Sequence, residues 1–433
     1  MQDLTQLIER VFERLVINMR GHKKLTACES EKQQAAWYRT YLLMKRFSVS
    51  GALRPRIILI VSLLIVLLHQ TTSASVPSPD SMGAVSASVM KLVAFCNTPK
   101  AGLDPRDVAV VIDYVLKSKP LKEITLPEVE NAPGGYFESD LRIRLTDFLQ
   151  YSYNSQIPAA LTSPSSLRYS RWINRTEELK KITSSWKLPG PADNPLVIRQ
   201  LLRNGITPDQ TTGVYYEYDL KRTLILLHYK GRRVLITIAK QADVSDVGKK
   251  GFVLGHDDDW NYYYTGVPGA AKPGLGWVKS YIYDFFALGV YIDSVPSPSM
   301  IRSGYFQWLR AGWSGVNFVQ PEHIIKGMKR HDRHSKAILE SPNLPASNEI
   351  TSVYQKLSAM PRKDLVQRYE ALQRARDAMA IQKGKIKPGQ ANRQETYANV
   401  SREQIIEELM VEYLKLALGK PSPIPPNLIT GVY

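Results

Sequence analysis

Cysteine is scarce in this sequence, and no apolar run is long enough to cross a bilayer. Two cysteines, Cys28 and Cys96, occur in 433 residues, which excludes a disulfide framework. A chain of this length can bury its own core without one. The main apolar run, residues 57–68, is interrupted only by Ser62. It falls well short of the roughly 20 residues that a membrane-spanning helix needs.

Complete catalytic and nucleotide-binding motifs are also lacking. Ser184 and Lys187 match the S-x-x-K pattern of acylating serine enzymes, but no K-T-G follows them. Residues 312–315 resemble a nucleophile elbow, yet Val316 stands where that turn requires glycine. The loop 266–276 fits neither a Walker loop nor G-x-G-x-x-G. The sequence therefore indicates no particular reaction, and we expect no cofactor.

The short apolar run has the flanks of a secretory signal peptide. Four basic residues precede it: Lys45, Arg46, Arg54 and Arg56. Small residues follow, and they suit cleavage after Ala74. We expect residues 44–74 to direct export to the periplasm or the exterior and to be removed; an uncleaved membrane anchor is the alternative. Because signal n-regions are short, we expect Met44 to be the true start and residues 1–43 to be a doubtful extension.

Basic residues exceed acidic ones. The chain has 57 Lys and Arg against 40 Asp and Glu, a formal net charge of +17, and 44 % hydrophobic residues. This composition indicates a globular protein. A basic exported protein is expected to meet anionic membranes or wall polymers. Lys and Arg also dominate residues 362–393; such a segment is usually a solvated helix face and loop, and docking on an anionic surface is the alternative. Nucleic acid is a less favoured partner because of export.

Helical patterns lie on both sides of a β-rich segment. In residues 75–205, Asp104-Pro105 is a helix start signal. Further helices in that region are predicted at residues 84–95, 139–149, 176–186 and 194–205, the last closed by Gly205. Residues 301–418 predict helices at 321–340, 361–382 and after the capping box at Ser401. The tail, residues 419–433, is Pro-rich and expected to be extended.

The β-rich segment, residues 206–300, predicts an antiparallel sheet. Residues 212–239 contain three runs of Tyr, Val, Ile, Leu and Thr, with breaks at 219–221 and 230–232, which predicts a meander. More strands are expected at 260–265, 278–285 and 289–293. The predicted fold is α+β, with an antiparallel sheet at about residues 210–295 flanked by helices from both ends.

Two groups of side chains are candidate sites. Five residues could hold a metal ion: His256, Asp257, Asp259, His331 and His334. The alternative is a solvated turn and a polar helix face, since no metal motif has its full spacing. Eight aromatic residues could line a ligand cleft: Tyr216, Tyr218, Trp260, Tyr263, Trp277, Tyr281, Trp308 and Trp313. The alternative is an ordinary core, because strands favour aromatic residues.

These features favour a non-catalytic function. We expect an exported cell-envelope protein whose aromatic cleft, between sheet and helices, binds a lipid or another apolar or amphipathic ligand. A metal-assisted envelope hydrolase that uses the His and Asp residues is one alternative. A structural or assembly factor is the other.

Overall fold

The computed structural model describes residues 79–98, 102–117, 122–173, 194–210, 212–272, 276–296, 299–389 and 397–430. The predicted signal peptide, the segment before it, the predicted helix at 176–186 and the S-x-x-K residues lie outside these ranges. Within them, no helix combines the length and apolar character needed to cross a membrane.

A large antiparallel sheet organises the described chain, which confirms the predicted α+β class. The strand order is β1 (Glu123–Val129), β2 (Ala132–Leu141), β13 (Ser299–Trp313), β12 (Tyr281–Pro296), β7 (Arg232–Gln241), β6 (Glu217–Tyr229), β4 (Leu196–Ile206) and β3 (Leu167–Trp172). β14 (Val316–Asn317) pairs with β13. Two small sheets contain β5 (Val214–Tyr215), β8 (Lys249–Val253) and β9 (Tyr262–Pro268), and β10 (Ala270–Lys272) with β11 (Gly276–Val278).

The predicted meander is correct at one turn and wrong at the other. Lys230 and Gly231 join β6 to β7 with φ values of 49° and 73°, the geometry of a tight hairpin turn. The break predicted at 219–221 does not occur, because β6 continues through it.

The sheet also extends into regions predicted to be helical. The helix predicted at 194–205 is strand β4, in which alternate residues from Ile198 to Asn204 are buried. Pairing with β3 and β6 on its two sides outweighs the helical spacing of its leucines. Gly205 is therefore no helix cap; a Cβ there would lie 2.4 Å from the Tyr169 ring. Strands β1, β2, β3 and β13 extend the sheet in the same way.

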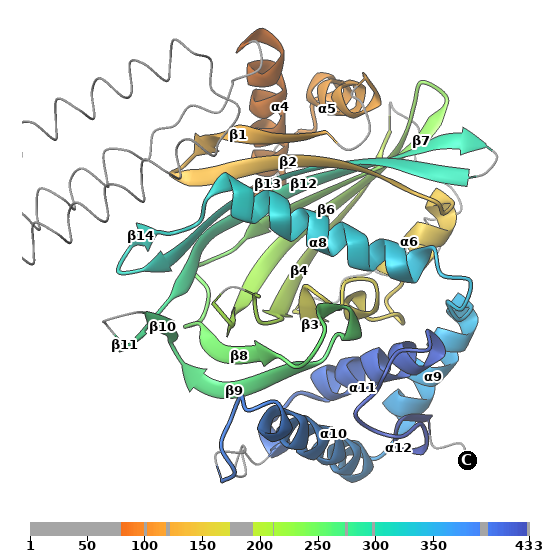
Figure 1. The fold of residues 1–433 in the computed structure, drawn as a ribbon. Helices are drawn as coiled ribbons and strands as arrows, with labels where there is room; N and C mark the ends of the chain where they lie inside the picture. Colours follow the sequence, from red (N-terminus) through yellow and green to blue (C-terminus); the bar gives the residue numbers. More distant parts are fainter. Residues whose placement is uncertain are drawn as a thin grey trace, which may run out of the picture. The chain divides into compact units, whose positions relative to one another are not determined.

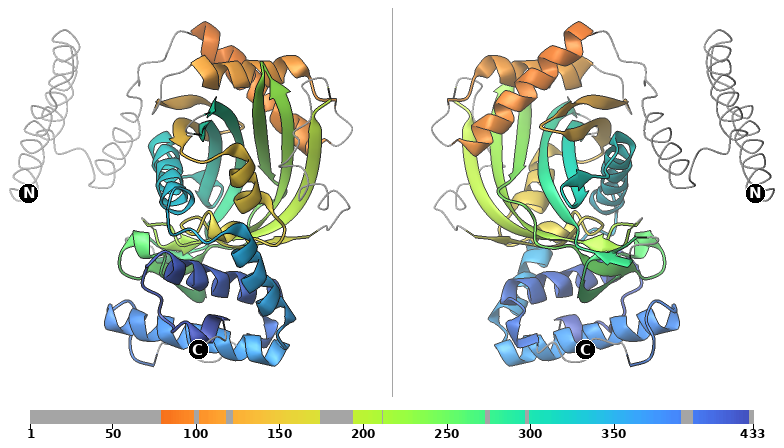
Figure 2. Two further views of the ribbon diagram at one scale, coloured as in Figure 1. Left: turned by 90° about the vertical axis from the view of Figure 1, so that its right-hand side faces the viewer. Right: turned by 90° about the vertical axis from the view of Figure 1, so that its left-hand side faces the viewer.

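Helices cover the two faces of the sheet unequally (Figure 1). α4 (Pro79–Asn97) and α5 (Pro105–Lys117) pack on the outer face, over residues that include Ile236, Phe286 and Trp308. α6 (Leu145–Tyr153) and α8 (Pro321–Leu339) lie on the concave face, within the curve of the sheet (Figure 2). α8 packs against β1, β2 and β13, and α6 covers one end of the central strands.

The C-terminal helices pack against β3, β9 and the short helix η1 (Ala159–Leu161). They are α9 (Ser347–Ala359), α10 (Arg362–Gln382), α11 (Arg402–Ala417) and α12 (Asn427–Thr430). α10 and α11 confirm two predicted helices, and the Ser401 hydroxyl accepts the predicted capping bond from Gln404 N–H at 3.2 Å. Buried ion pairs hold this layer together: Arg168 of β3 and Arg376 of α10 both pair with Glu408 of α11.

Candidate functional site

Two predicted metal ligands meet beside α8. The short helix η2 (Asp257–Asp259) brings the Asp257 carboxylate to 2.9 Å from Nε2 of His334. Asp257, Asp258 and His334 each place a possible ligand atom within 4.8 Å of the others. The structure thus gathers three donors, of which Asp258 was not predicted.

Neighbouring side chains already bind these donors. Arg330 donates two hydrogen bonds to Asp257, from Nε at 2.8 Å and Nη2 at 2.5 Å. The Trp260 indole N–H donates to Nδ1 of His334 at 2.8 Å, which leaves the Nε2–H of His334 to donate to Asp257. A neutral imidazole in this tautomer has no free lone pair for a metal. Burial would raise the pKa of Asp257, but hydrogen bonds from Arg330 and His334 lower it well below its usual value.

We call Asp257, Trp260, Arg330 and His334 the clamp, because they tie η2 to α8. The other predicted ligands lie apart from it. His256 is exposed at the start of η2, and Asp259 is half-buried. His331 faces Ser166, with 3.3 Å between Nδ1 and Oγ. A metal site at these residues stays a prediction.

The predicted aromatic residues are spread over separate parts of the core. Four are buried: Tyr218, Trp260, Tyr263 and Trp308. Trp308 lies on the outer face and donates its indole N–H to the Pro127 carbonyl at 2.9 Å. Trp313 stacks on Phe318. Tyr281 is half-buried, and the side chain of Trp277 lies outside the described part. Tyr216 and Tyr218 belong to an apolar cluster on the concave face.

This cluster borders a half-buried surface on the concave face. Strand register places Thr237 and Ala239 of β7 beside Gly289 and Ala287 of β12. Thr237, Ala239 and Ala287 are half-buried and form its floor, and Gly289 is buried. Larger side chains surround the floor, each only half-buried: Trp172, Arg222, Phe285, Tyr305, Gln307 and Leu309. These residues lie on the concave face. Along their strands they alternate with core residues of the outer face, or they contact the concave-face clusters directly. We call these six residues, with Thr237, Ala239 and Ala287, the concave patch.

Arg222 is the charged member of the concave patch. Its Nε donates to Oε1 of Gln200 at 2.5 Å. The guanidinium also lies 5.4 Å from the centroid of the Tyr153 ring and 5.8 Å from that of Trp172. No carboxylate pairs with Arg222 in the described part of the chain, and burial lowers its pKa. The sequence did contain a signal for it, since Arg222 interrupts the apolar alternation of Leu220, Leu224 and Leu226 in β6.

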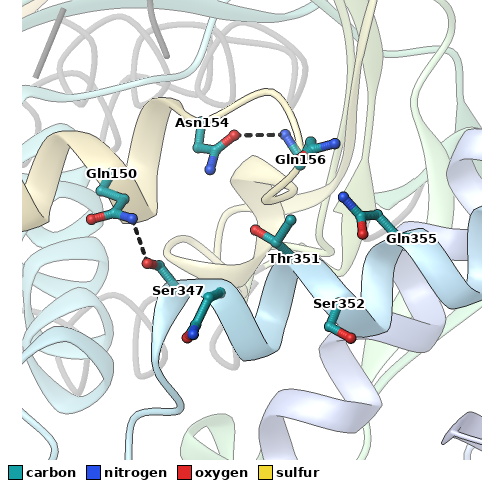
Figure 3. A pocket seen from close by; sticks show the side chains of 8 residues that line it. Gln150, Asn154, Gln156, Ser347, Thr351, Ser352 and Gln355 are labelled. Atoms are coloured by element: carbon teal, nitrogen blue, oxygen red, sulfur yellow. Dashed lines mark hydrogen bonds between the residues drawn. The ribbon is translucent and has the colours of Figure 1, made fainter. Parts of the chain in front are cut away.

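A separate open groove of about 380 Å³ lies between α6 and α9 (Figure 3). Its lining is polar and uncharged: Gln150, Asn154, Gln156, Ser347, Asn348, Thr351, Ser352 and Gln355. Gln150 Nε2 donates to Ser347 Oγ at 2.5 Å. The groove offers no aromatic or aliphatic wall, so it does not suit an amphipathic ligand.

Much of the basic segment at residues 362–393 has a structural role. Arg362 donates to the Tyr397 carbonyl at 3.3 Å, and Arg368 donates to the Asn427 carbonyl at 3.1 Å. Arg376 is buried against Glu408. These three arginines hold the C-terminal layer together, which leaves mainly lysines for contact with an anionic surface.

Comparison with known proteins identifies no relative from which a function could be transferred. No family model matches the chain, and no curated protein does so at a significant level. The concave patch and the clamp are therefore interpreted from their own chemistry.

Proposed function

We propose that this chain is an exported, non-catalytic envelope protein that binds an amphipathic ligand on the concave patch. The observation that carries the proposal is the half-burial of small and aromatic side chains in the middle of the sheet. The opposite face of the same strands is closed by α4 and α5. Apolar side chains that stay in contact with water at such a place are typical of a binding surface.

The alternative of a metal-assisted hydrolase has less support. Its best donors, Asp257 and His334, already share hydrogen bonds with Arg330 and Trp260, and two nearby arginines disfavour a cation. The proposed export rests on residues 44–74 of the sequence. Terminal sequencing of the protein from its native host tests it: a chain that begins at Ser75 supports export, and an unprocessed cytosolic chain contradicts it.

Binding is tested by calorimetric titration with dodecanoate below its micelle-forming concentration. Ala287→Phe fills the floor of the concave patch and is expected to weaken binding at least about tenfold, because a bulky ring takes the volume of the ligand. Ala378→Leu, an exposed change on α10, is the matched control and should bind like the wild type. Circular dichroism checks that both variants are folded. Equal binding by all three proteins would contradict the proposal.

A further inference from the structure

We infer that the concave patch selects amphiphiles with an anionic head group, and that Arg222 and Gln200 bind this head group. The inference rests on the function proposed above and names the ligand class of the same site. It depends on two sets of hydrogen-bond donors, on Arg222 and on Gln200, that have no protein acceptor in the described part of the chain and that lie beside the apolar floor of the concave patch.

The first set belongs to Arg222. Two other poorly exposed arginines have carboxylate partners: Arg302 pairs with Glu138 at 2.9 Å, and Arg168 pairs with Glu408 at 2.8 Å. Arg222 has none in the described chain, and of its five N–H donors only that of Nε makes a protein hydrogen bond. Withdrawing a cation from water without a counter-ion costs free energy. A ligand carboxylate or phosphate would supply the missing partner.

The second set belongs to Gln200. This residue is 6 % exposed, and its Nε2 has no hydrogen-bond partner. Buried amide donors are nearly always paired in folded proteins, so one left open needs an explanation. Oε1 of the same amide accepts from Arg222 Nε, so the amide with the unpaired donor lies against the guanidinium. Together they suit an oxyanion, which only accepts hydrogen bonds.

The apolar part of the ligand has a path away from these donors. Strand register runs from Arg222 to Ala239, then Ala287, then Gln307. Three strand spacings of about 4.8 Å give this row a length of roughly 14 Å. Phe285 and Leu309 lie on the next row of the same face. An acyl chain laid across the two alanines would thus cover half-buried apolar surface while its head group contacts Arg222.

Four probes with the same tail test the inference by calorimetry: dodecanoate, dodecyl phosphate, dodecanol and dodecyltrimethylammonium. At least one anion is expected to bind about ten- to a hundredfold more tightly than dodecanol, as a charge-assisted hydrogen bond predicts. The better anion distinguishes a carboxylate from a phosphate head group. The cation is expected to bind most weakly.

Variants locate the selectivity. Arg222→Met should reduce the affinity for the preferred anion to that for dodecanol, and should remain folded because it removes an unpaired charge. Arg171→Met, at an exposed position of β3, is the control and should keep the preference. If dodecanol binds as tightly as both anions and Ala287→Phe weakens it, the inference is wrong and the proposed function stands. If none of the four probes binds, the proposed function itself fails.

Discussion

Replacement of Glu407 by glutamine is expected to stabilise the protein, and more so as the pH rises. Glu407 lies in α11, is 6 % exposed, and accepts a hydrogen bond from the Ser170 backbone N–H at 2.9 Å. Burial, with smaller contributions from the charges of Glu403 and Glu408, raises its pKa from 4.5 to about 8. The carboxyl group is therefore protonated in the folded protein at neutral pH, and glutamine closely resembles that form.

The expected magnitude follows from the linkage between protonation and folding. Since the folded pKa of Glu407 is raised, its contribution to stability is fully present below pH 4.5 and is lost as the pH rises toward 8. One pKa unit corresponds to about 1.4 kcal/mol. Between pH 4.5 and about pH 7 the wild type should thus lose about 3 kcal/mol that the Glu407→Gln variant keeps.

Urea denaturation between about pH 4 and pH 7 measures this difference in the free energy of unfolding. The two proteins should unfold at similar urea concentrations at the acidic end, and the variant should be the more stable one near neutrality. Glu128→Gln, at an exposed position of β1, is the control and should stay within about 0.5 kcal/mol of the wild type. A stability difference for Glu407→Gln that does not change with pH would refute the reasoning.

Three further predictions concern the clamp and the sheet. Asp257→Asn leaves Arg330 without its charge partner and should cost about 2–3 kcal/mol in thermal denaturation; an equal cost for the exposed control Asp258→Asn would contradict the clamp. Zinc should leave the melting temperature unchanged, because His334 has no free lone pair; an increase that Asp257→Asn abolishes would support a metal site. Gly205→Ala should cost about 1–3 kcal/mol, because the new Cβ meets a tyrosine ring at 2.4 Å. Gly327→Ala, in open space on α8, should instead stabilise by about 0.5–1 kcal/mol, so equal losses for the two glycines would count against this packing.

Local chemistry explains which elements could be predicted from the sequence. The starts of α5 and α11 depend on capping residues next to them in the chain, Asp104 and Ser401. Strand β4 could not be predicted from the sequence, because its leucines fit a helical spacing and it pairs with other segments of the chain. The same holds for β13, which pairs with β2 more than 150 residues earlier in the chain.

The candidate site was predictable only in part. The metal hypothesis included Asp257 and His334, which the structure places in contact, but the sequence could not reveal that Arg330 and Trp260 already bind them. Among the predicted aromatic residues, Trp308 does not line a ligand cleft, because it is buried on the outer face of the sheet. In the sequence, Arg222 stands out as a lone charge in an apolar strand. Its lack of a carboxylate partner could not be predicted, because it depends on the neighbours Gln200 of β4 and Ala239 of β7.

Photo-crosslinking with a fatty acid that carries a diazirine in its tail, followed by peptide mass spectrometry, tests binding on the concave patch most directly. Labels are predicted on β7, β12 and β13, at or next to Ala239, Ala287 and Leu309, and an excess of unlabelled dodecanoate should suppress them. Labelling confined to the polar groove between α6 and α9, or spread over the surface without competition, would contradict binding on the concave patch.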